Sequence, residues 1–162
     1  MFDKFGEFDS YEEINRAAKA QLEEGDLEAI KTIAKENGLD PEDAEDFCTG
    51  AIEELTTPCL AAIGKLELET KDLKLEGALK DWTDSIKQSC MENEEMALAV
   101  RRKGKSLKDC MAMILKKSFG EKTQLDDRIT KAAGLRPPLY ISIPGKAQIK
   151  EIVREYYLGE KK

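Results

Sequence analysis

The sequence predicts a mostly α-helical protein: a compact bundle of short amphipathic helices with one short edge strand or hairpin near residues 139–143. Three observations favour this fold class. Apolar residues recur at helical spacing, capping residues and glycines mark helix ends, and only 6% of the 162 residues are aromatic while 36% are charged. A chain of this length buries about 70% of its unfolded surface, so it can fold without disulfides.

The first fifty residues predict three consecutive helices. Each helix has a start signal, and the first two also have a stop signal. The start signals are Ser10 with Glu13, Asp26, and Asp40 with Pro41; the stop signals are Gly25 and Asn37 with Gly38. We therefore expect short helices joined by tight turns.

The middle of the chain predicts two further helices. Thr57 and Pro58 start the first of them, but the apolar residues of 66–69 alternate with period two. Residues 64–70 are therefore compatible with either a continuing helix or a short strand. Helical spacing returns at Leu75, Leu79, Trp82 and Ile86. We expect Trp82, the single tryptophan, to anchor the core.

The remaining residues predict four helices and the short extended segment. Asn93 starts a helix that ends in cations, where the helix dipole favours positive charge. The next helices are predicted from Ser106 to Gly120 and from Leu125 to Ala133, before a break at residues 134–138. Prolines on both sides confine the apolar segment 139–143 to a sheet edge. The last helix carries apolar residues at Ile149, Ile152, Val153, Tyr156 and Tyr157.

Charge divides the chain into an acidic helical region, residues 1–92, and a basic helical region, residues 93–162, which we expect to pack together as one globular unit. Residues 1–100 carry 10 basic and 26 acidic side chains, and residues 101–162 carry 16 and 7. This asymmetry suggests an electrostatic partner for at least one region. Neutralisation of one region by the other explains it equally well.

Several classes of function are excluded or disfavoured. The chain has no histidine, which excludes catalysis by imidazole and zinc sites that need it. The segment 104–106 resembles the end of a P-loop, but Ala99 stands where that motif needs glycine. The four cysteines form no C-x-x-C pair, so we expect buried thiols: Cys48, Cys59, Cys90 and Cys110. We expect no metal, no cofactor and no catalytic residues.

No targeting signal or membrane-spanning segment is evident from the sequence. The first residues do not combine a basic segment with an apolar run, and no stretch approaches 18 apolar residues. We therefore expect a cytoplasmic protein without membrane contact.

Two charged segments are candidate binding surfaces. The acidic one lacks the calcium-loop pattern but could imitate the phosphate row of a nucleic acid: Glu42, Asp43, Glu45 and Asp46. The basic one could contact a partner or nucleic-acid phosphates: Arg101, Arg102, Lys103, Lys105, Lys108, Lys116 and Lys117. Only Phe119 in this stretch could stack on a base, so recognition of single-stranded sequence is not expected. Ordinary solvation and helix capping explain both segments without a ligand.

Residues 103–110, followed by Ile143-Pro144 and residues 149–157, resemble the carboxy-terminal half of the PcfK-like family. That family comprises small proteins of conjugative plasmids and transposons, some of which are described as Cas9 inhibitors. The segments 1–8 and 40–46 are similar to proteins of the same mobile elements. The resemblance implies an anti-CRISPR role or an accessory role on transferred DNA.

These observations lead to two main hypotheses. The first is a non-enzymatic anti-CRISPR protein that binds a Cas9-type nuclease with its guide RNA, with nucleic-acid contact through the basic segment. The second is a DNA-binding or conjugation accessory protein that contacts double-stranded DNA through residues 101–162. An enzyme using acidic residues and a metal ion is a third class, which no residue spacing supports. The oligomeric state stays open.

Overall fold

The computed structural model describes residues 4–159 and confirms the predicted mostly α-helical class, with 67% helix and one small antiparallel sheet. The chain divides into two compact units, Met1–Lys108 and Asp109–Lys162. Unit 1 contains α1 (Tyr11–Glu24), α2 (Leu27–Glu36), α3 (Pro41–Thr49), α4 (Pro58–Leu73), α5 (Ala78–Glu92) and α6 (Glu94–Arg101). The elements α7 (Leu107–Gly120), β1 (Thr123–Gln124), α8 (Asp127–Ala132), β2 (Tyr140–Ile141) and α9 (Lys146–Leu158) follow, and the unit boundary falls in the first turn of α7.

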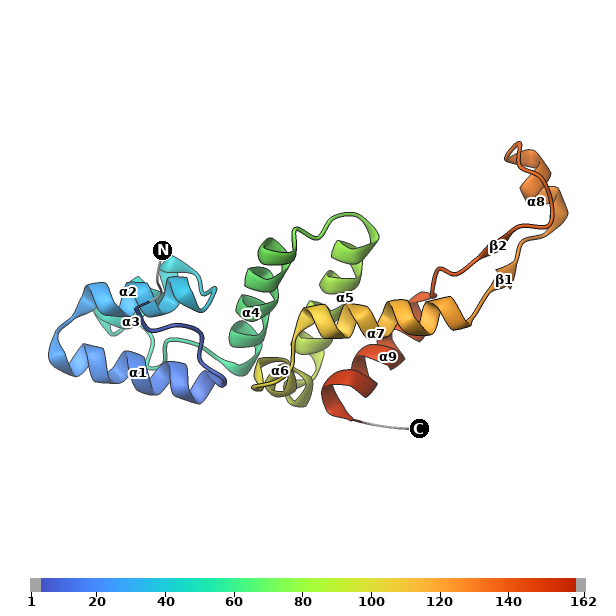
Figure 1. Cartoon of the computed structure of the whole chain (residues 1–162). Coiled ribbons are helices and arrows are strands. Elements are labelled where there is room, and N and C mark those ends of the chain that lie inside the picture. The colour runs from blue at the N-terminus through green and yellow to red at the C-terminus, as the bar shows by residue number, and fades with distance from the viewer. Residues whose placement is uncertain (1–3, 160–162) are drawn as a thin grey trace. The chain divides into compact units, whose positions relative to one another are not determined.

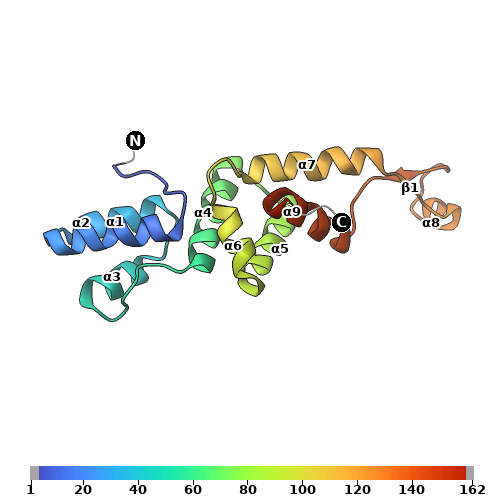
Figure 2. The same cartoon turned by 90° about the horizontal axis from the view of Figure 1, so that it is seen from below.

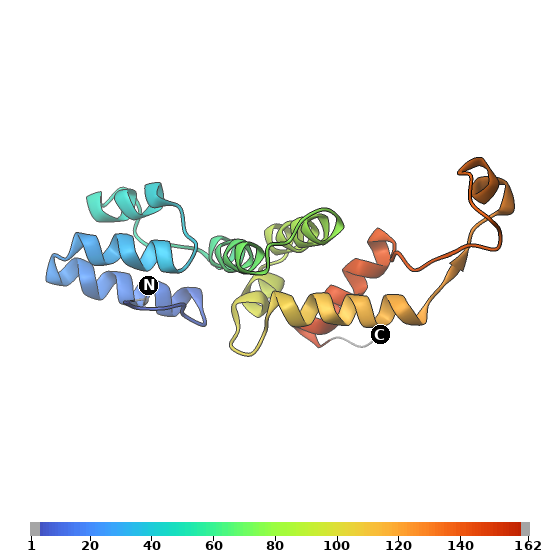
Figure 3. The same cartoon turned by 45° about the horizontal axis from the view of Figure 1, so that its top comes forward.

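Side-chain caps begin the first three helices, as predicted. The Ser10 hydroxyl accepts a hydrogen bond from the backbone N–H of Glu13 at 3.1 Å, and Asp26 and Asp40 cap α2 and α3 in the same way. Gly25 adopts the left-handed conformation that ends α1. The chain therefore reverses, and α1 and α2 lie antiparallel and side by side (Figure 1; Figure 3).

The core of α1 to α4 is mainly aliphatic. Its aliphatic side chains include the isoleucines of α1 and α2, and aromatic residues complete it: Phe47 of α3 is buried, and Phe5, Phe8 and Tyr11 pack against the cluster. The buried members of this cluster are Ile14, Ala18, Ile30, Ile33, Ala34, Leu39, Ala44, Phe47, Leu55 and Ala61. Asn15 also ties α1 to the segment before α4, because its side-chain amide exchanges two hydrogen bonds with the backbone of Thr56.

Residues 64–70 continue α4, so the alternative of a short strand is wrong. Ala62 and Leu66 are buried one helical turn apart, while Leu68 is half-buried. The period-two appearance arises because Leu66 faces the core and Leu68 faces the side of the same helix. The continuous helix carries Lys65 and Glu69, which are used below.

Helix α5 begins at Ala78, three residues after the first apolar residue that predicted it. Gly77 precedes the helix with a φ of 59°, a left-handed conformation that favours glycine. Trp82 is half-buried on α5, while Ile86 and Cys90 are fully buried. The predicted boundary after residue 92 falls between α5 and α6, and α6 packs against both α4 and α5 within unit 1.

In unit 2 a two-stranded stem leads to α8. Strand β2 confirms the expected extended segment near residues 139–143, and it pairs with β1 through Thr123 opposite Ile141 and Gln124 opposite Tyr140. Figure 2 shows β1 next to α8. Four of the five apolar residues predicted for the last helix are buried on α9, and Tyr156 is half-buried beside Tyr157. An ion pair between Lys117 and Glu155 links α7 to α9.

Candidate functional site

The predicted acidic residues lie on α3, at its start and along its exposed side. Glu42, Glu45 and Asp46 are exposed, and Asp43 is half-buried. We call these four residues the acidic surface. Glu42 and Asp43 occupy the first turn, where the helix dipole stabilises negative charge. Local structure therefore explains part of the cluster.

The carboxylates of the acidic surface repel one another. Burial raises the pKa of Asp43, and the neighbouring Asp40 and Asp46 raise it further. Among residues 4–159, no ion pair joins any of these four carboxylates to a cation. Unit 1 carries 15 basic and 26 acidic residues, a balance of −11. The acidic surface therefore lies in a negative field that a cationic partner would relieve.

Arg101 requires a correction to the predicted basic surface. Its side chain is only 2% exposed, so it cannot belong to a surface that contacts nucleic acid in this structure. The guanidinium donates to the carbonyl oxygens of Phe8 at 2.8 Å and Ala61 at 3.0 Å, and to the side chain and carbonyl of Asn37. Burial lowers the pKa of Arg101, while the carboxylates of Glu7 and Asp9 oppose that shift.

Asn37 is the main partner of Arg101 and is itself completely buried. Its side-chain oxygen also accepts from the backbone N–H of Phe8 at 2.9 Å, and its side-chain nitrogen donates to Ile33 at 2.8 Å. The bond to Ile33, together with the bond from Arg101 to the Asn37 carbonyl, engages carbonyl oxygens at the end of α2. Arg101 and Asn37 therefore join α6, α2 and the segment before α1 in unit 1.

Arg102, Lys103 and Lys105 lie in the loop between α6 and α7. Two side chains of α4 form hydrogen bonds with the backbone at the two ends of this loop. The Lys65 ammonium donates to the carbonyl oxygens of Val100 at 2.9 Å and Lys105 at 2.7 Å. The Glu69 carboxylate accepts from the backbone N–H of Leu107 at 2.5 Å. A cation thus caps the end of α6 and an anion caps the start of α7, as the helix dipoles favour.

Lys65 and Glu69 affect each other's charge. Burial lowers the pKa of Lys65 and raises that of Glu69, and their mutual attraction opposes both shifts. One carboxylate oxygen of Glu69 is buried without a hydrogen-bond partner in the described part of the chain. The loop is therefore fixed by a charged pair that sequence reasoning did not identify.

The other predicted cations divide between the two units. On the loop and the first turn of α7, Arg102, Lys103 and Lys108 are exposed, and Lys105 is half-buried. In unit 2, Lys116 is exposed, whereas Lys117 is half-buried and bonded to Glu155. The exposed cations of unit 1 lie on or next to the backbone that Lys65 and Glu69 hold by hydrogen bonds.

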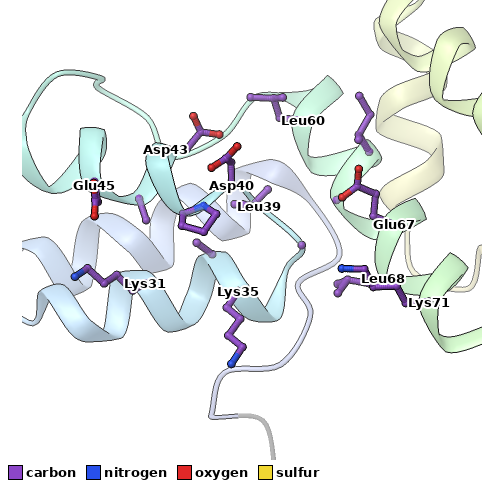
Figure 4. A pocket seen from close by; sticks show the side chains of 16 residues that line it. Lys31, Lys35, Leu39, Asp40, Asp43, Glu45, Leu60, Glu67, Leu68 and Lys71 are labelled. Carbon is purple, nitrogen blue, oxygen red and sulfur yellow. The ribbon is translucent and has the colours of Figure 1, made fainter.

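A groove of about 720 Å³ lies between α2, α3 and α4. Leu39, Leu60, Ile63 and Leu68 supply its apolar lining. Figure 4 shows Asp43 of α3 on one side of the groove and Lys35 of α2 and Lys71 of α4 on the other, with the carboxylate of Glu67 also on the α4 wall. Sequence reasoning missed this feature, because its lining residues come from three helices that only the fold brings together.

The remaining chemistry of the described residues is limited. No group of three or more acidic or cysteine side chains within residues 4–159 is arranged to hold a metal ion. No helix in that range is long and apolar enough to cross a membrane. Cys90 and Cys110 are buried as predicted, but Cys48 and Cys59 are half-buried. Burial raises the pKa of Cys90 to about 12, which disfavours a reactive thiolate there.

Comparisons with known protein families, with characterised proteins and with solved structures found no match for this chain.

Proposed function

We propose that this chain is a non-enzymatic anti-CRISPR protein that binds a Cas9-type RNA-guided nuclease with its guide RNA. The nuclease as partner comes from the resemblance of residues 103–110 and 149–157 to the PcfK-like family. The structural observation that carries the proposal is the acidic surface: four carboxylates on one short helix, without a cationic partner among residues 4–159, in a unit with a balance of −11.

The physical basis is charge complementarity. Nucleases of this class hold their guide and target strands in a positively charged channel. A rigid helix with closely spaced carboxylates can occupy such a channel and exclude the phosphates of the target. The field of unit 1 would speed the encounter, and salt would weaken it.

Neutral variants of the acidic surface test the mechanism. We replace the four residues together, as Glu42→Gln, Asp43→Asn, Glu45→Gln and Asp46→Asn, and measure inhibition of plasmid cleavage by purified Cas9 with guide RNA. A matched control removes four other exposed charges of unit 1: Glu23→Gln, Glu24→Gln, Glu53→Gln and Glu54→Gln. We expect the first variant to lose inhibition and the control to retain it. Equal inhibition by both would contradict this mechanism.

A DNA-binding or conjugation accessory role is the second candidate. The observation that favours it is the loop after α6, where Arg102, Lys103 and Lys108 are exposed and the backbone is held by Lys65 and Glu69. Each contact to a phosphate releases counterions, so binding would weaken steeply with salt. A gel shift of double-stranded DNA by the full chain, lost in the variant Arg102→Gln with Lys103→Gln, would favour this role.

A further inference from the structure

We propose that the groove between α2, α3 and α4 is a docking site for an amphipathic segment of a partner protein. The segment carries apolar side chains in its middle, a cation at the end that meets α3, and a carboxylate at the end that meets Lys35 and Lys71. This inference rests on the proposed function, since it describes the segment of the partner nuclease that unit 1 binds.

The lining favours a protein segment over a nucleic acid. Leu60 is 42% exposed at the groove, and Ile63 and Leu68 are half-buried along the same face of α4. Leu39 lies opposite them in the turn between α2 and α3. An amphipathic helix with leucine-like side chains would cover Leu60, Ile63 and Leu68, whereas phosphates would meet apolar carbon and the negative field of unit 1.

Two glycines set the distance between the helices that line the groove. Gly38 and Gly64 approach each other through their backbones, and a Cβ at Gly64 would lie 2.6 Å from the carbonyl oxygen of Asn37. The groove is therefore built on a close contact between the end of α2 and the middle of α4.

Charge complementarity fixes the chemistry of the occupant. Figure 4 shows Asp40 and Asp43 on the side of the groove near Leu60, and Lys35 and Lys71 on the opposite side. No ion pair within residues 4–159 engages any of these four side chains. Glu67 of α4 also lines the groove, but it is paired with Lys87 at 3.7 Å. A segment with a cation at one end and a carboxylate at the other would pair with both sets.

The test is a titration of the full chain against a fluorescent helical peptide of about 15 residues, followed by anisotropy. The peptide carries glutamates in its first turn, leucines at i, i+3, i+4 and i+7, and arginines in its last turn, as the helix dipole favours. Two control peptides replace either the leucines by serine or the arginines by glutamine. We expect saturable binding of the first peptide and binding at least about tenfold weaker for each control.

Protein variants locate the binding. Leu60→Ser should weaken binding of the first peptide about tenfold, as truncation of a central contact does. Leu27→Ser is the matched control, because Leu27 is 44% exposed in the same unit but does not line the groove. Lys71→Glu should weaken binding as well. Equal affinities of the Leu60 and Leu27 variants, or no saturable binding below about 1 mM peptide, would overturn the inference.

Different results would contradict the proposed function and the docking site. Peptide binding in the groove without inhibition of the nuclease would leave the docking site standing and contradict the proposed function. Inhibition of the nuclease by a protein whose Leu60 and Leu27 variants bind peptide equally would contradict the docking site alone.

Discussion

Gly38, in the turn after α2, packs its backbone directly against Gly64 in the middle of α4. A Cβ at Gly64 would lie 2.6 Å from the carbonyl oxygen of Asn37 and 3.0 Å from that of Gly38. Gly38 has a φ of 73°, which glycine adopts without strain. This contact allows the end of α2 to reach α4 beside the groove.

Gly64→Ala should destabilise the protein by about 1–3 kcal/mol, since the atoms in the way are backbone and the two segments must move apart. Gly120→Ala is the matched control: that glycine is also helical, and no atom lies within 4 Å of its added Cβ. We expect the control to be neutral or stabilising by up to about 1 kcal/mol. Urea unfolding of both variants measures the difference, and equal stabilities would contradict the close approach.

Arg101→Met should destabilise the protein by about 3 kcal/mol, because it leaves buried oxygens of Phe8, Asn37 and Ala61 without their donor. Arg101→Lys should not restore stability, since one ammonium cannot reproduce the planar donor geometry. Arg102→Met, on the exposed neighbour, should change stability by less than about 0.5 kcal/mol. Denaturant unfolding of the three variants tests this order. A stable Arg101→Met variant with weakened DNA binding would instead support the surface role predicted from sequence.

Glu36→Gln should destabilise the protein at pH 7 by about 1 kcal/mol. Burial raises the pKa of Glu36, but the backbone N–H groups of Lys4, Phe5 and Gly6 outweigh it, so the pKa lies below its ordinary value of 4.5. A lowered folded-state pKa stabilises the fold above the unfolded value, and this stabilisation is lost as pH falls through the folded value. The stability difference between wild type and variant should therefore shrink below pH 4.5. Thermal unfolding from pH 7 to pH 3 measures it, and a difference independent of pH would contradict this assignment.

Lys65→Met should loosen the loop between α6 and α7, because the ammonium donates to carbonyl oxygens at both ends of that loop. We expect faster hydrogen exchange at residues 102–107 and little change in α1. Lys71→Met, on an exposed position of the same helix, is the control. Unchanged exchange in the Lys65 variant would show that the loop does not depend on this cap.

Helix starts could be predicted from the sequence, because a capping residue interacts only with residues close to it in the chain. Ser10, Asp26 and Asp40 each cap the helix that they predicted, because an N-cap depends on neighbours two or three residues away. The ambiguous residues 64–70 needed tertiary packing to be resolved, since a leucine at the side of a helix and one on a strand have the same local pattern.

The charged residues were harder to place from sequence. Arg101 stands in a run of cations that predicts a surface residue, yet it follows Ala97 by four residues on the buried face of α6. That spacing was the available signal. The partners of Lys65 and Glu69 lie 35 to 40 residues away along the chain, so no local pattern could have predicted their role.

The most direct test of the proposed function is a plasmid-cleavage assay with purified Cas9 and guide RNA, in which this protein is added before or after the target DNA. A gel shift of the DNA without Cas9 runs beside it. We predict that the protein blocks cleavage when added first, and that added salt weakens the block. Full cleavage at a large molar excess of the protein, together with a clear shift of DNA alone, would contradict the inhibitor role and favour the DNA-binding accessory role.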